Sequence, residues 1–397
     1  MLNEAVILAG GQASRLGPLA AEIPKVLLPV AGRPFIDHLV WNIRRHGIRR
    51  VVFALGRHSD QVVAHLGDGG AFGIEALYAV EDEPLGTGGA LALAAQQLRG
   101  DEALVINGDT LFEVNYLDLA LLRRQTGASV VVGLRAVDDV SRFGAVTLEG
   151  TRVSAFSEKG RSGPGFVNSG VYVIGRDAFD RLAEGPSSLE TGLLVPLTTD
   201  GGLAARAYRG TFIDIGVPEA LEEAQTLVSA WSRKPAVFFD RDGVLNDDVG
   251  YVHAPEQFRW MPGAREAVKA ANDAGSLAIV VTNQAGIGRG YYTEADFEAF
   301  SRWIEVQLAE IGAHLDATYF CPHHPEAALP PYLVACDCRK PKPGMILQAA
   351  ADWDVDLERS VLIGDKDSDM AAAEAAGVRA VRYLGGDVAA FVESVVG

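Results

Sequence analysis

The stretch that most constrains the fold of this chain is residues 235–246, which read Pro-Ala-Val-Phe-Phe-Asp-Arg-Asp-Gly-Val-Leu-Asn. Residues 236–239 form a short apolar run, typical of a buried parallel strand, and Asp240 and Asp242 follow it directly. Open α/β sheets bind ligands at the carboxyl ends of their strands, so these carboxylates are candidates for a shared cation and phosphate site. The alternative is a simple Asp-Gly turn after a core strand, and the downstream sequence decides between the two.

The composition narrows the class of protein. A chain of 397 residues is too long for one ordinary core and predicts about two or three domains. Its 48% hydrophobic and 22% charged residues are typical of a soluble globular protein. A net charge of −17 argues against nucleic acid as a partner, because phosphate backbones select basic surfaces. The sequence has no run of about 18 apolar residues, so we expect no membrane span, and it opens with no basic leader, which favours the cytoplasm.

The first part of the chain alternates short apolar strands with helices, which predicts a doubly wound α/β sheet. After residue 128 the pattern becomes β-rich, and we expect these strands to build a lobe over the sheet for a second substrate. A predicted helix over 218–229 is followed by a short polar stop at 231–235 rather than a long linker. The predicted domains are therefore residues 1–231 and 235–397.

Two glycine-rich turns follow strands in the first domain. Gly10 and Gly11 come directly after the first strand and can bring backbone amides against phosphate. Arg15 and Lys25 supply two cations suited to a triphosphate. A second loop around Gly88 leads into a helix, and its backbone can lie against a flat base. Neither the P-loop spacing nor the dinucleotide-binding spacing is present.

Acidic and amide side chains complete the candidate site of the first domain. Asp109 follows the strand at 103–107, and Asp214 is a second candidate metal ligand. In the β-rich part, Lys159 and Asn168 offer a cation and a side-chain amide suited to a sugar phosphate and its hydroxyl groups.

Taken together, these motifs resemble those of the sugar-1-phosphate nucleotidyltransferases over roughly residues 1–231. They are Leu8-Ala9-Gly10-Gly11, Arg15-Leu16, Pro24-Lys25, Pro84-Leu85-Gly86-Thr87-Gly88, Gly108-Asp109, Val167-Asn168-Ser169-Gly170 and Asp214-Ile215-Gly216. One departure is Ala13, which stands where the family usually has a third glycine. If that position needs a positive φ, the alanine would strain the loop.

The resemblance implies a role for each of these polar residues. Asp109 and Asp214 would hold Mg²⁺ against the α-phosphate of the nucleotide. The side chains of Arg15 and Lys25 would neutralise the departing pyrophosphate. Lys159 and Asn168, in that order, would hold the sugar phosphate and the sugar.

Polar residues also end the strands of the second domain. Thr282 and Asn283 follow an apolar strand at 277–281, and Asp365 follows another at 361–364. A hydroxyl at a strand terminus can donate to a phosphoryl oxygen, although such a Thr often only caps the next turn. Thr293 is predicted to cap a helix over 294–311.

The three cysteines of the chain lie close together beside histidine. Cys321 and His323 form one pair, and Cys336 and Cys338 form a second pair a short distance along the chain. Three thiols and an imidazole in two tight pairs predict a closed structural zinc site in a reducing compartment. His324 is an alternative to His323 as the fourth ligand.

The second domain resembles the haloacid-dehalogenase-type phosphatases, in particular the zinc-bearing group that contains the D-glycero-D-manno-heptose 1,7-bisphosphate 7-phosphatases. The shared motifs span nearly all of residues 235–397 and include Asp240-Arg241-Asp242, Gly250-Tyr251-Val252-His253, Thr282-Asn283-Gln284, Arg289-Gly290-Tyr291-Tyr292, Cys321-Pro322-His323-His324-Pro325-Glu326, Cys338-Arg339-Lys340-Pro341 and Gly364-Asp365-Lys366. Histidinol-phosphate phosphatases share the zinc pattern, so the resemblance leaves the substrate more open than the chemistry.

By this resemblance Asp240 is the nucleophile, and Asp242 protonates the leaving group and then activates water. Mg²⁺ would lie between the carboxylates of Asp240 and Asp365 and the backbone carbonyl of Asp242. The remaining expected contacts are phosphoryl binding by Thr282 and Lys340, and substrate contacts by Asn283, Arg289 and Arg339.

The pairing of the two domains predicts a bifunctional enzyme with small-molecule substrates. A heptose phosphatase leaves heptose 1-phosphate, and a nucleotidyltransferase consumes a sugar 1-phosphate. The prediction is removal of the 7-phosphate, followed by transfer of GMP from GTP to give GDP-heptose, with GTP resting on this pathway analogy alone. The alternatives are the same two chemistries on other substrates, such as a hexose 1-phosphate with UTP or dTTP, or one half that binds nucleotide sugars without catalysis.

Overall fold

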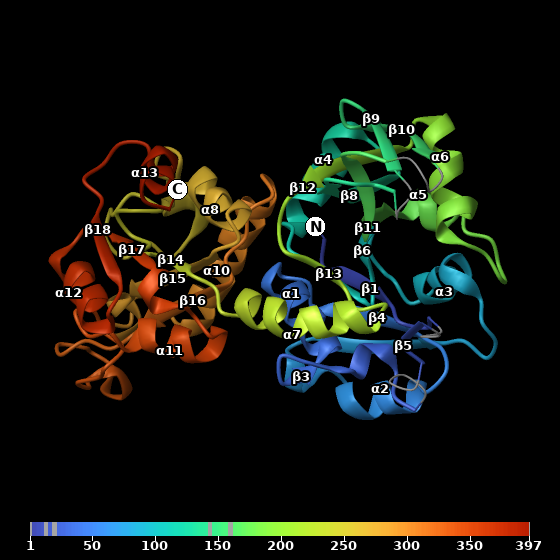
Figure 1. The fold of residues 1–397 in the computed structure, drawn as a ribbon. Helices are drawn as coiled ribbons and strands as arrows, with labels where there is room; N and C mark the ends of the chain where they lie inside the picture. Colours follow the sequence, from blue (N-terminus) through green and yellow to red (C-terminus); the bar gives the residue numbers. More distant parts are fainter. Residues whose placement is uncertain (1, 12–14, 18–21, 142–144, 158–161, 397) are drawn as a thin grey trace. The chain divides into compact units, whose positions relative to one another are not determined.

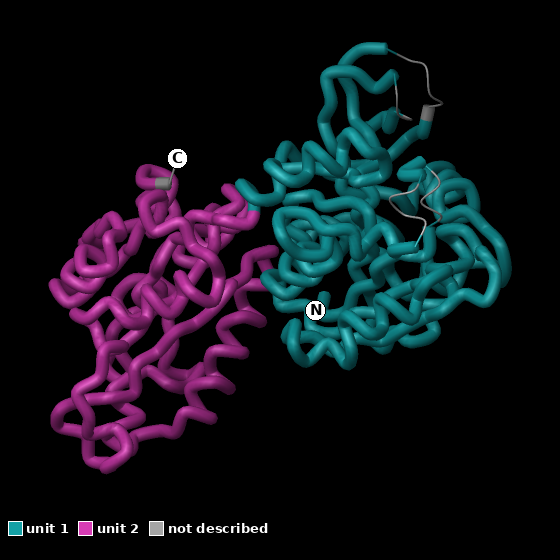
Figure 2. Tube along the Cα trace, turned by 60° about the horizontal axis from the view of Figure 1, so that its bottom comes forward, with its two compact units in different colours: residues 1–231 teal, residues 232–397 magenta. Residues whose placement is uncertain are grey.

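In the computed structural model the described residues are 2–11, 15–17, 22–141, 145–157 and 162–396. Ala13 and Lys159, two residues singled out from the sequence, lie outside these ranges. The chain forms two compact units, Met1–Trp231 and Ser232–Gly397, which are distinguished by colour in Figure 2. Each unit has its own sheet and its own core, and each is described separately below.

The first unit is built on a nine-stranded sheet with the order β5-β4-β1-β6-β11-β8-β12-β10-β9 (Figure 1). The strands β5, β4, β1 and β6 run parallel, whereas β11 is antiparallel to both of its neighbours in this order, β6 and β8. The bounds of these strands are β1 Glu4–Leu8, β4 Arg50–Leu55, β5 Glu75–Val80, β6 Glu102–Asn107, β8 Val130–Val137, β9 Ala145–Glu149, β10 Arg152–Ser157, β11 Gly165–Gly175 and β12 Leu203–Tyr208.

The β-rich part of this unit extends the same sheet instead of forming a separate one over it. The long strand β11 makes the connection, because one stretch of it pairs with β6 and with β8 while its start also pairs with β9. Two small ribbons complete the β-structure, namely β2 Pro29–Val30 with β3 Arg33–Pro34, and β7 Thr110–Phe112 with β13 Phe212–Asp214.

Helices of the first unit occur between the strands, as the sequence pattern predicts. Their bounds are η2 Lys25–Leu27, α1 Phe35–Arg45, α2 Ser59–Leu66, η3 Gly70–Phe72, α3 Gly86–Ala95, α4 Tyr116–Thr126, α5 Arg176–Phe179, the π-helical η4 Glu190–Leu194, α6 Val195–Asp200 and α7 Pro218–Ser232. Helix α3 is apolar and buried over most of its length, and it contributes Leu91 and Ala94 to a core shared with Val6 and Val105 of the sheet. This packing fixes the second glycine loop, which opens the helix.

The second unit has a five-stranded, fully parallel sheet with the order β16-β15-β14-β17-β18. All four residues of the central strand β14 are buried, as expected for a parallel strand covered on both faces. The elements are β14 Ala236–Phe239, η5 Pro255–Gln257, α8 Ala264–Asp273, β15 Leu277–Asn283, α9 Ala285–Gly288, α10 Glu294–Ala309, β16 Ala317–Cys321, η6 Pro330–Tyr332, α11 Gly344–Trp353, η7 Leu357–Arg359, β17 Val361–Gly364, α12 Asp367–Ala376, β18 Arg379–Arg382 and α13 Val388–Val396.

Helix α10 begins where the sequence predicts. Thr293 is its N-cap, and its side chain accepts a hydrogen bond from the Asp296 backbone amide at 3.1 Å. The Asp296 carboxylate in turn accepts from the Thr293 amide at 2.9 Å, which completes a capping box. Over the described part of the chain, no helix combines the length and the apolar character needed to cross a membrane.

Candidate active sites

Three polar strand ends meet at one edge of the parallel sheet in the second unit. Asp240 follows β14, Thr282 lies near the end of β15, and Asp365 follows β17, and these three strands are neighbours in the sheet. The Asp240 amide also donates to the Ile363 carbonyl at 2.9 Å, which holds the start of the turn against β17. The topology therefore brings together residues that the sequence separates widely.

Three carboxylates at this edge are arranged to hold a cation. One oxygen each from Asp240, Asp365 and Asp369 lies within 4.8 Å of the others. The Oδ1 atom of Asp365 is buried and has no hydrogen-bond partner, as expected for an oxygen that serves a metal ion. Gly243 is required here, because a Cβ at that position would lie 2.4 Å from Asp365 Oδ2. The donor set suits Mg²⁺, which prefers carboxylate oxygens.

Asp369 is a member of this cluster that the sequence reasoning missed. It is completely buried, and its carboxylate accepts from the Lys366 amide at 3.0 Å in the first turn of α12. The available signal was its spacing, since a residue four positions after Asp365 on a following helix returns to the same strand end.

Lys340 neutralises two of the three acids. Its Nζ atom lies 2.9 Å from Asp240 Oδ1 and 2.6 Å from Asp369 Oδ1, and it donates to the Val281 carbonyl at 2.9 Å. Burial alone would lower the pKa of this ammonium, but the two carboxylates reverse the effect and the pKa is raised. Burial raises the pKa of the Asp240 carboxyl to about 6 against the opposing charge of Lys340. A phosphate entering here would meet a fixed positive charge.

Asn283 holds the backbone of this lysine in place. Its side-chain nitrogen donates to the Lys340 carbonyl at 3.0 Å, and its side-chain oxygen accepts from the Lys340 amide at 3.1 Å. Both ends of the amide are thereby used within the protein. In this structure Asn283 supports the position of Lys340 and contacts the segment that carries it.

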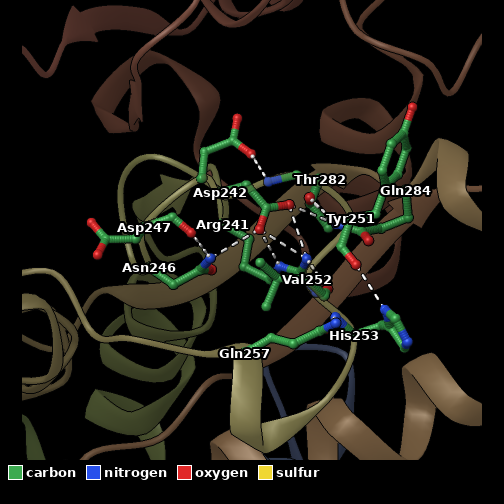
Figure 3. Close-up of polar contacts among 12 residues, drawn as sticks. Arg241, Asp242, Asn246, Asp247, Tyr251, Val252, His253, Gln257, Thr282 and Gln284 are labelled. Atoms are coloured by element: carbon green, nitrogen blue, oxygen red, sulfur yellow. Dashed lines mark hydrogen bonds and ion pairs between the residues drawn. The ribbon is translucent and has the colours of Figure 1, made fainter.

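Asp242 is held by a dense set of donors (Figure 3). Arg241 contacts both of its oxygens at 2.9 Å through Nη2 and contacts Oδ1 at 3.1 Å through Nε. Asn246 donates to Oδ1 and Gln284 donates to Oδ2, each at 3.0 Å. A carboxylate has about four lone-pair sites, so these contacts fill them. These contacts fix the position and orientation of the Asp242 carboxylate.

Thr282 is joined to the same network. Its hydroxyl oxygen accepts from Gln284 Nε2 at 2.8 Å, which leaves the hydroxyl proton for another acceptor such as a phosphoryl oxygen. Gln284 is fixed from its other end by the Tyr292 hydroxyl, which donates to Oε1 at 2.6 Å. Burial raises the pKa of Tyr292 to about 12, so this hydroxyl keeps its proton.

Four sulfur and nitrogen ligand atoms converge in the loop after β16. Cys321 Sγ lies 3.1 Å from Cys338 Sγ and 3.5 Å from Cys336 Sγ, and His323 Nδ1 lies 3.3 Å from Cys338 Sγ. His324 is not part of the cluster, because its Nδ1 accepts from the backbone amide two residues later. Three thiols and one imidazole at these separations fit a closed four-coordinate metal site, and zinc is the metal that this donor set favours.

Arg289 and Arg339, the two arginines named from the sequence, contact residues in or near the cysteine loop. Arg339 donates to the His323 carbonyl at 3.2 Å, which connects the residue before Lys340 to the cysteine cluster. Arg289 Nη2 lies 3.7 Å from the exposed carboxylate of Glu326, and its Nε atom is buried with no hydrogen-bond partner.

In the first unit, acids and cations converge on Gly216. Lys25 Nζ lies 2.5 Å from Asp109 Oδ2 and 3.9 Å from Asp214 Oδ1. A Cβ on Gly216 would lie 2.8 Å from Asp214 Oδ1, 3.1 Å from Lys25 Nζ and 3.3 Å from Arg15 Nη2. The pKa of Asp214 is raised, mainly by burial and secondly by the negative charge of Asp109. Two acids that disfavour each other's ionised form are expected where a divalent cation binds and offsets their charge.

Glu81, a residue not singled out from the sequence, lies beside both glycine loops. Its Oε2 accepts from the Leu85 amide in the second loop at 2.6 Å. Its Oε1 would lie 2.5 Å from a Cβ on Gly10 in the first loop, so a larger residue there would have to displace the Glu81 side chain. Gly88 is equally confined, with a Cβ position 2.6 Å from Ser187 Oγ, whereas a Cβ on Gly11 would meet nothing within 4 Å.

Asn168 lies on β11 at the start of a register shift. Its Nδ2 donates to the Tyr172 hydroxyl at 2.8 Å, and its Oδ1 accepts from the Gly170 amide at 3.0 Å. Gly170 has φ +76°, and a Cβ there would lie 2.4 Å from the Asn107 side chain. The amide group is thus oriented by the irregular strand that follows it.

Comparison with known proteins assigns the class. The sequence model of the nucleotidyl transferase family matches residues 4–230, and that of the HAD-hydrolase-like family matches residues 337–390. The chain therefore belongs to the nucleotidyl transferase family, with a HAD-like phosphatase unit at its carboxyl side. It is a bifunctional enzyme that joins these two activities, as the sequence motifs predict.

Relatives of each unit are known separately. The D-glycero-beta-D-manno-heptose-1,7-bisphosphate 7-phosphatase of Rhodopseudomonas palustris is 48% identical over 164 residues, which are 41% of this chain and 91% of the relative. The D-glycero-alpha-D-manno-heptose-1,7-bisphosphate 7-phosphatase of Burkholderia mallei is 53% identical over 143 residues, which are 36% of this chain and 76% of the relative. The crystal structure of HddC from Yersinia pseudotuberculosis is 30% identical, covers 57% of this chain and 99% of its own, and has a TM-score of 0.51.

Proposed function

We propose that this enzyme makes a GDP-activated heptose in two steps. The second unit removes the 7-phosphate of D-glycero-α-D-manno-heptose 1,7-bisphosphate, and the first unit transfers GMP from GTP to the resulting heptose 1-phosphate. The observation that carries the first step is the arrangement of Asp240, Asp242 and Lys340 at one strand edge. The names of the phosphatase relatives supply the sugar, and they include both anomers of the bisphosphate.

The phosphatase chemistry follows from these three side chains. Asp240 attacks phosphorus, the bond between phosphorus and the sugar oxygen breaks, and Asp242, which enters this step protonated, gives its proton to the departing oxygen. Water then attacks the aspartyl-phosphate and returns a proton to Asp242, which releases inorganic phosphate and regenerates the Asp240 carboxylate. Lys340 and Thr282 hold the phosphoryl oxygens during both halves.

The nucleotidyl transfer needs positioning more than covalent help. An oxygen of the sugar 1-phosphate attacks the α-phosphorus of the nucleotide in line, and the bond to the departing pyrophosphate breaks. Arg15 and Lys25 neutralise that pyrophosphate, while Lys159 and Asn168 bind the sugar phosphate and the sugar. When bound, Mg²⁺ offsets phosphate charge at both sites, held by Asp109 and Asp214 in the first unit and by the three-carboxylate cluster in the second.

Guanine is the base that the glycine loops favour. The Glu81 carboxylate lies between them and is an acceptor, which suits the N1–H and N2–H₂ donors of guanine. Uracil and thymine present one N–H between two carbonyl oxygens, and a carboxylate repels those oxygens. A structure of HddC complexed with GMP-PN, a guanine nucleotide on the related chain, supports the same choice.

The cysteine cluster and the net charge bear on the bound metal, the cellular compartment and the partners of the protein. A structural zinc ion bound by Cys321, His323, Cys336 and Cys338 would fix the loop that carries Arg339 and Lys340. Clustered free thiols suit the reducing cytoplasm, and the net charge of −17 suits small-molecule partners better than nucleic acid.

A phosphorus NMR time course tests both steps and their order. With the heptose 1,7-bisphosphate, GTP and Mg²⁺, inorganic phosphate should appear first, followed by pyrophosphate and a nucleoside-diphosphate signal. Separate reactions with the α and β anomers identify the one that is carried through to the nucleotide sugar. If neither anomer changes while other sugar phosphates do, the heptose assignment is wrong and the two reaction classes remain.

A further inference from the structure

Two exposed tyrosines form a pair on the surface of the second unit. Residues Tyr251 and Tyr291 are 43% and 55% exposed, and their ring centroids lie 4.8 Å apart at an interplanar angle of 81°. Large aromatic rings in contact with each other and with solvent offer an apolar face together with a polar hydroxyl. That combination is suited to the ring and hydroxyl groups of a sugar.

The backbone at Tyr251 adopts a conformation that its side chain disfavours. Its φ angle is +53°, in the left-handed region, and it directly follows Gly250 at φ +83°. Residues other than glycine, asparagine and aspartate rarely adopt this region, and such strain gathers at functional sites. Glycine would satisfy the backbone better, so the presence of a tyrosine indicates that its side chain is needed.

The segment that carries Tyr251 is tied to the catalytic network. The Val252 carbonyl accepts from Arg241 Nη2 at 2.6 Å, and the same guanidinium binds Asp242 (Figure 3). The Tyr251 carbonyl is 2.7 Å from His253 Nδ1. Tyr251 is therefore the immediate neighbour of Val252, whose carbonyl contacts the same Arg241 guanidinium that orients the Asp242 carboxylate.

The segment that carries Tyr291 is tied to the same network from the other side. Its neighbour Tyr292 donates to Gln284, and Gln284 donates to Asp242. The rings of Tyr292 and His253 stack at 4.5 Å with an interplanar angle of 9°. A second aromatic pair thus joins the two segments that carry Tyr251 and Tyr291.

A cation borders the outer pair. The Arg289 guanidinium carbon lies 6.0 Å from the centroid of the Tyr251 ring. The Arg289 side chain is 28% exposed, and its Nη2 lies 3.7 Å from the carboxylate of Glu326, whose side chain is 79% exposed. This arginine retains donor capacity for an anionic group bound against the tyrosines.

We propose that Tyr251 and Tyr291 form a sugar-binding wall that selects phosphorylated sugars over other phosphomonoesters. The sugar ring packs its C–H face on the tyrosines, and Arg289 receives the second anionic group of the substrate. This inference rests on the proposed phosphatase function, and it adds the residues that choose the substrate. The wall acts on substrate binding and takes no part in bond breaking.

The test compares a sugar bisphosphate with 4-nitrophenyl phosphate, which carries the same reacting group and no sugar. For Tyr291→Ala and Tyr251→Gly, the ratio of kcat/KM for the sugar substrate to kcat/KM for the aryl substrate should fall about 10-fold or more. Tyr251→Gly should also keep or raise the thermal midpoint, because glycine removes the backbone strain. Leu384→Ala, which removes another exposed apolar side chain, is the control and should leave the ratio unchanged.

Several results would count against the tyrosine wall or the function on which it rests. An unchanged ratio in both tyrosine variants overturns the wall, as does an equal loss on the two substrates, which would indicate a purely structural role. A lower thermal midpoint for Tyr251→Gly contradicts the reading of the backbone strain. If the wild-type enzyme releases phosphate from neither substrate, the phosphatase function itself fails and this inference fails with it.

Discussion

At the scale of single residues, the Asp240 carboxylate is the group on which phosphate release depends. The substitution Asp240→Asn removes the nucleophile while preserving the size of the side chain. We expect phosphate release from the heptose bisphosphate to fall to background. Pyrophosphate formation from supplied heptose 1-phosphate and GTP should remain within about twofold of wild type, because that chemistry uses the other unit. Coupled loss of both activities would contradict two independent sites.

Base selection is the second prediction at this scale. Glu81→Gln keeps the shape of the side chain but replaces one acceptor oxygen by a donor. A hydrogen bond to a charged group contributes about 1.5–3 kcal/mol, so kcat/KM for GTP should fall about 10- to 100-fold. The values for UTP and dTTP should stay constant or rise. A uniform fall for all three nucleotides would mean that Glu81 only holds the loops in shape.

At the scale of elements, the cysteine loop supports the phosphatase site from outside. Cys336→Ser removes one ligand of the cluster, and we expect the zinc content per chain to fall. Phosphatase activity should drop by about 10-fold or more, because Arg339 and Lys340 follow the second cysteine pair directly. His324→Ala is the matched control, since this neighbouring imidazole lies outside the cluster and zinc should be retained.

The N-terminus of α10 allows a local test of stability. Thr293→Ala removes the capping side chain, at a cost of about 1 kcal/mol to the helix. Hydrogen exchange of the first-turn amides should accelerate about fivefold, whereas Ser301→Ala in the same helix should leave those amides unchanged. Equal exchange in both variants would show that tertiary packing alone fixes this end of the helix.

The sequence was most informative where chemistry follows a strand. Asp240, Thr282 and Asp365 could be placed together because apolar runs mark strands, and parallel strands share their carboxyl edge. Glu81 could not be placed, because it follows strand β5, which is separated from β1 in the sheet, and no spacing in the sequence indicates its approach to Gly10. The donors around Asp242 were missed for the same reason, since side-chain packing decides them.

The β-rich segment shows a second limit of sequence patterns. Its strands could be recognised, but whether they form a new sheet or extend the first depends on which edges pair. Strand β11 is antiparallel to β6 and continues into contact with β8 and β9, which merges the two parts. Long-range pairing of this kind leaves no local signature.

At the scale of the whole molecule, the two units should be able to work on separate chains. The variants Asp240→Asn and Asp109→Ala each lack one step, so neither alone should convert the heptose bisphosphate to nucleotide sugar. An equimolar mixture should restore conversion, with heptose 1-phosphate passing through solution, as followed by phosphorus NMR. A mixture that remains inactive, although each variant retains its own step, would indicate that the intermediate must stay on one chain.

The left-handed backbone conformation of Tyr251 predicts which residue this position will adopt under directed evolution. A laboratory selection that rewards only resistance to heat should replace this tyrosine by glycine early, if the relief of backbone strain outweighs the lost contacts of the ring with Tyr291 and Arg289. A selection that rewards growth on the sugar pathway should retain it. The residue found at position 251 in an evolved population would therefore show whether selection had acted on the thermal stability or on the substrate selectivity of the phosphatase unit.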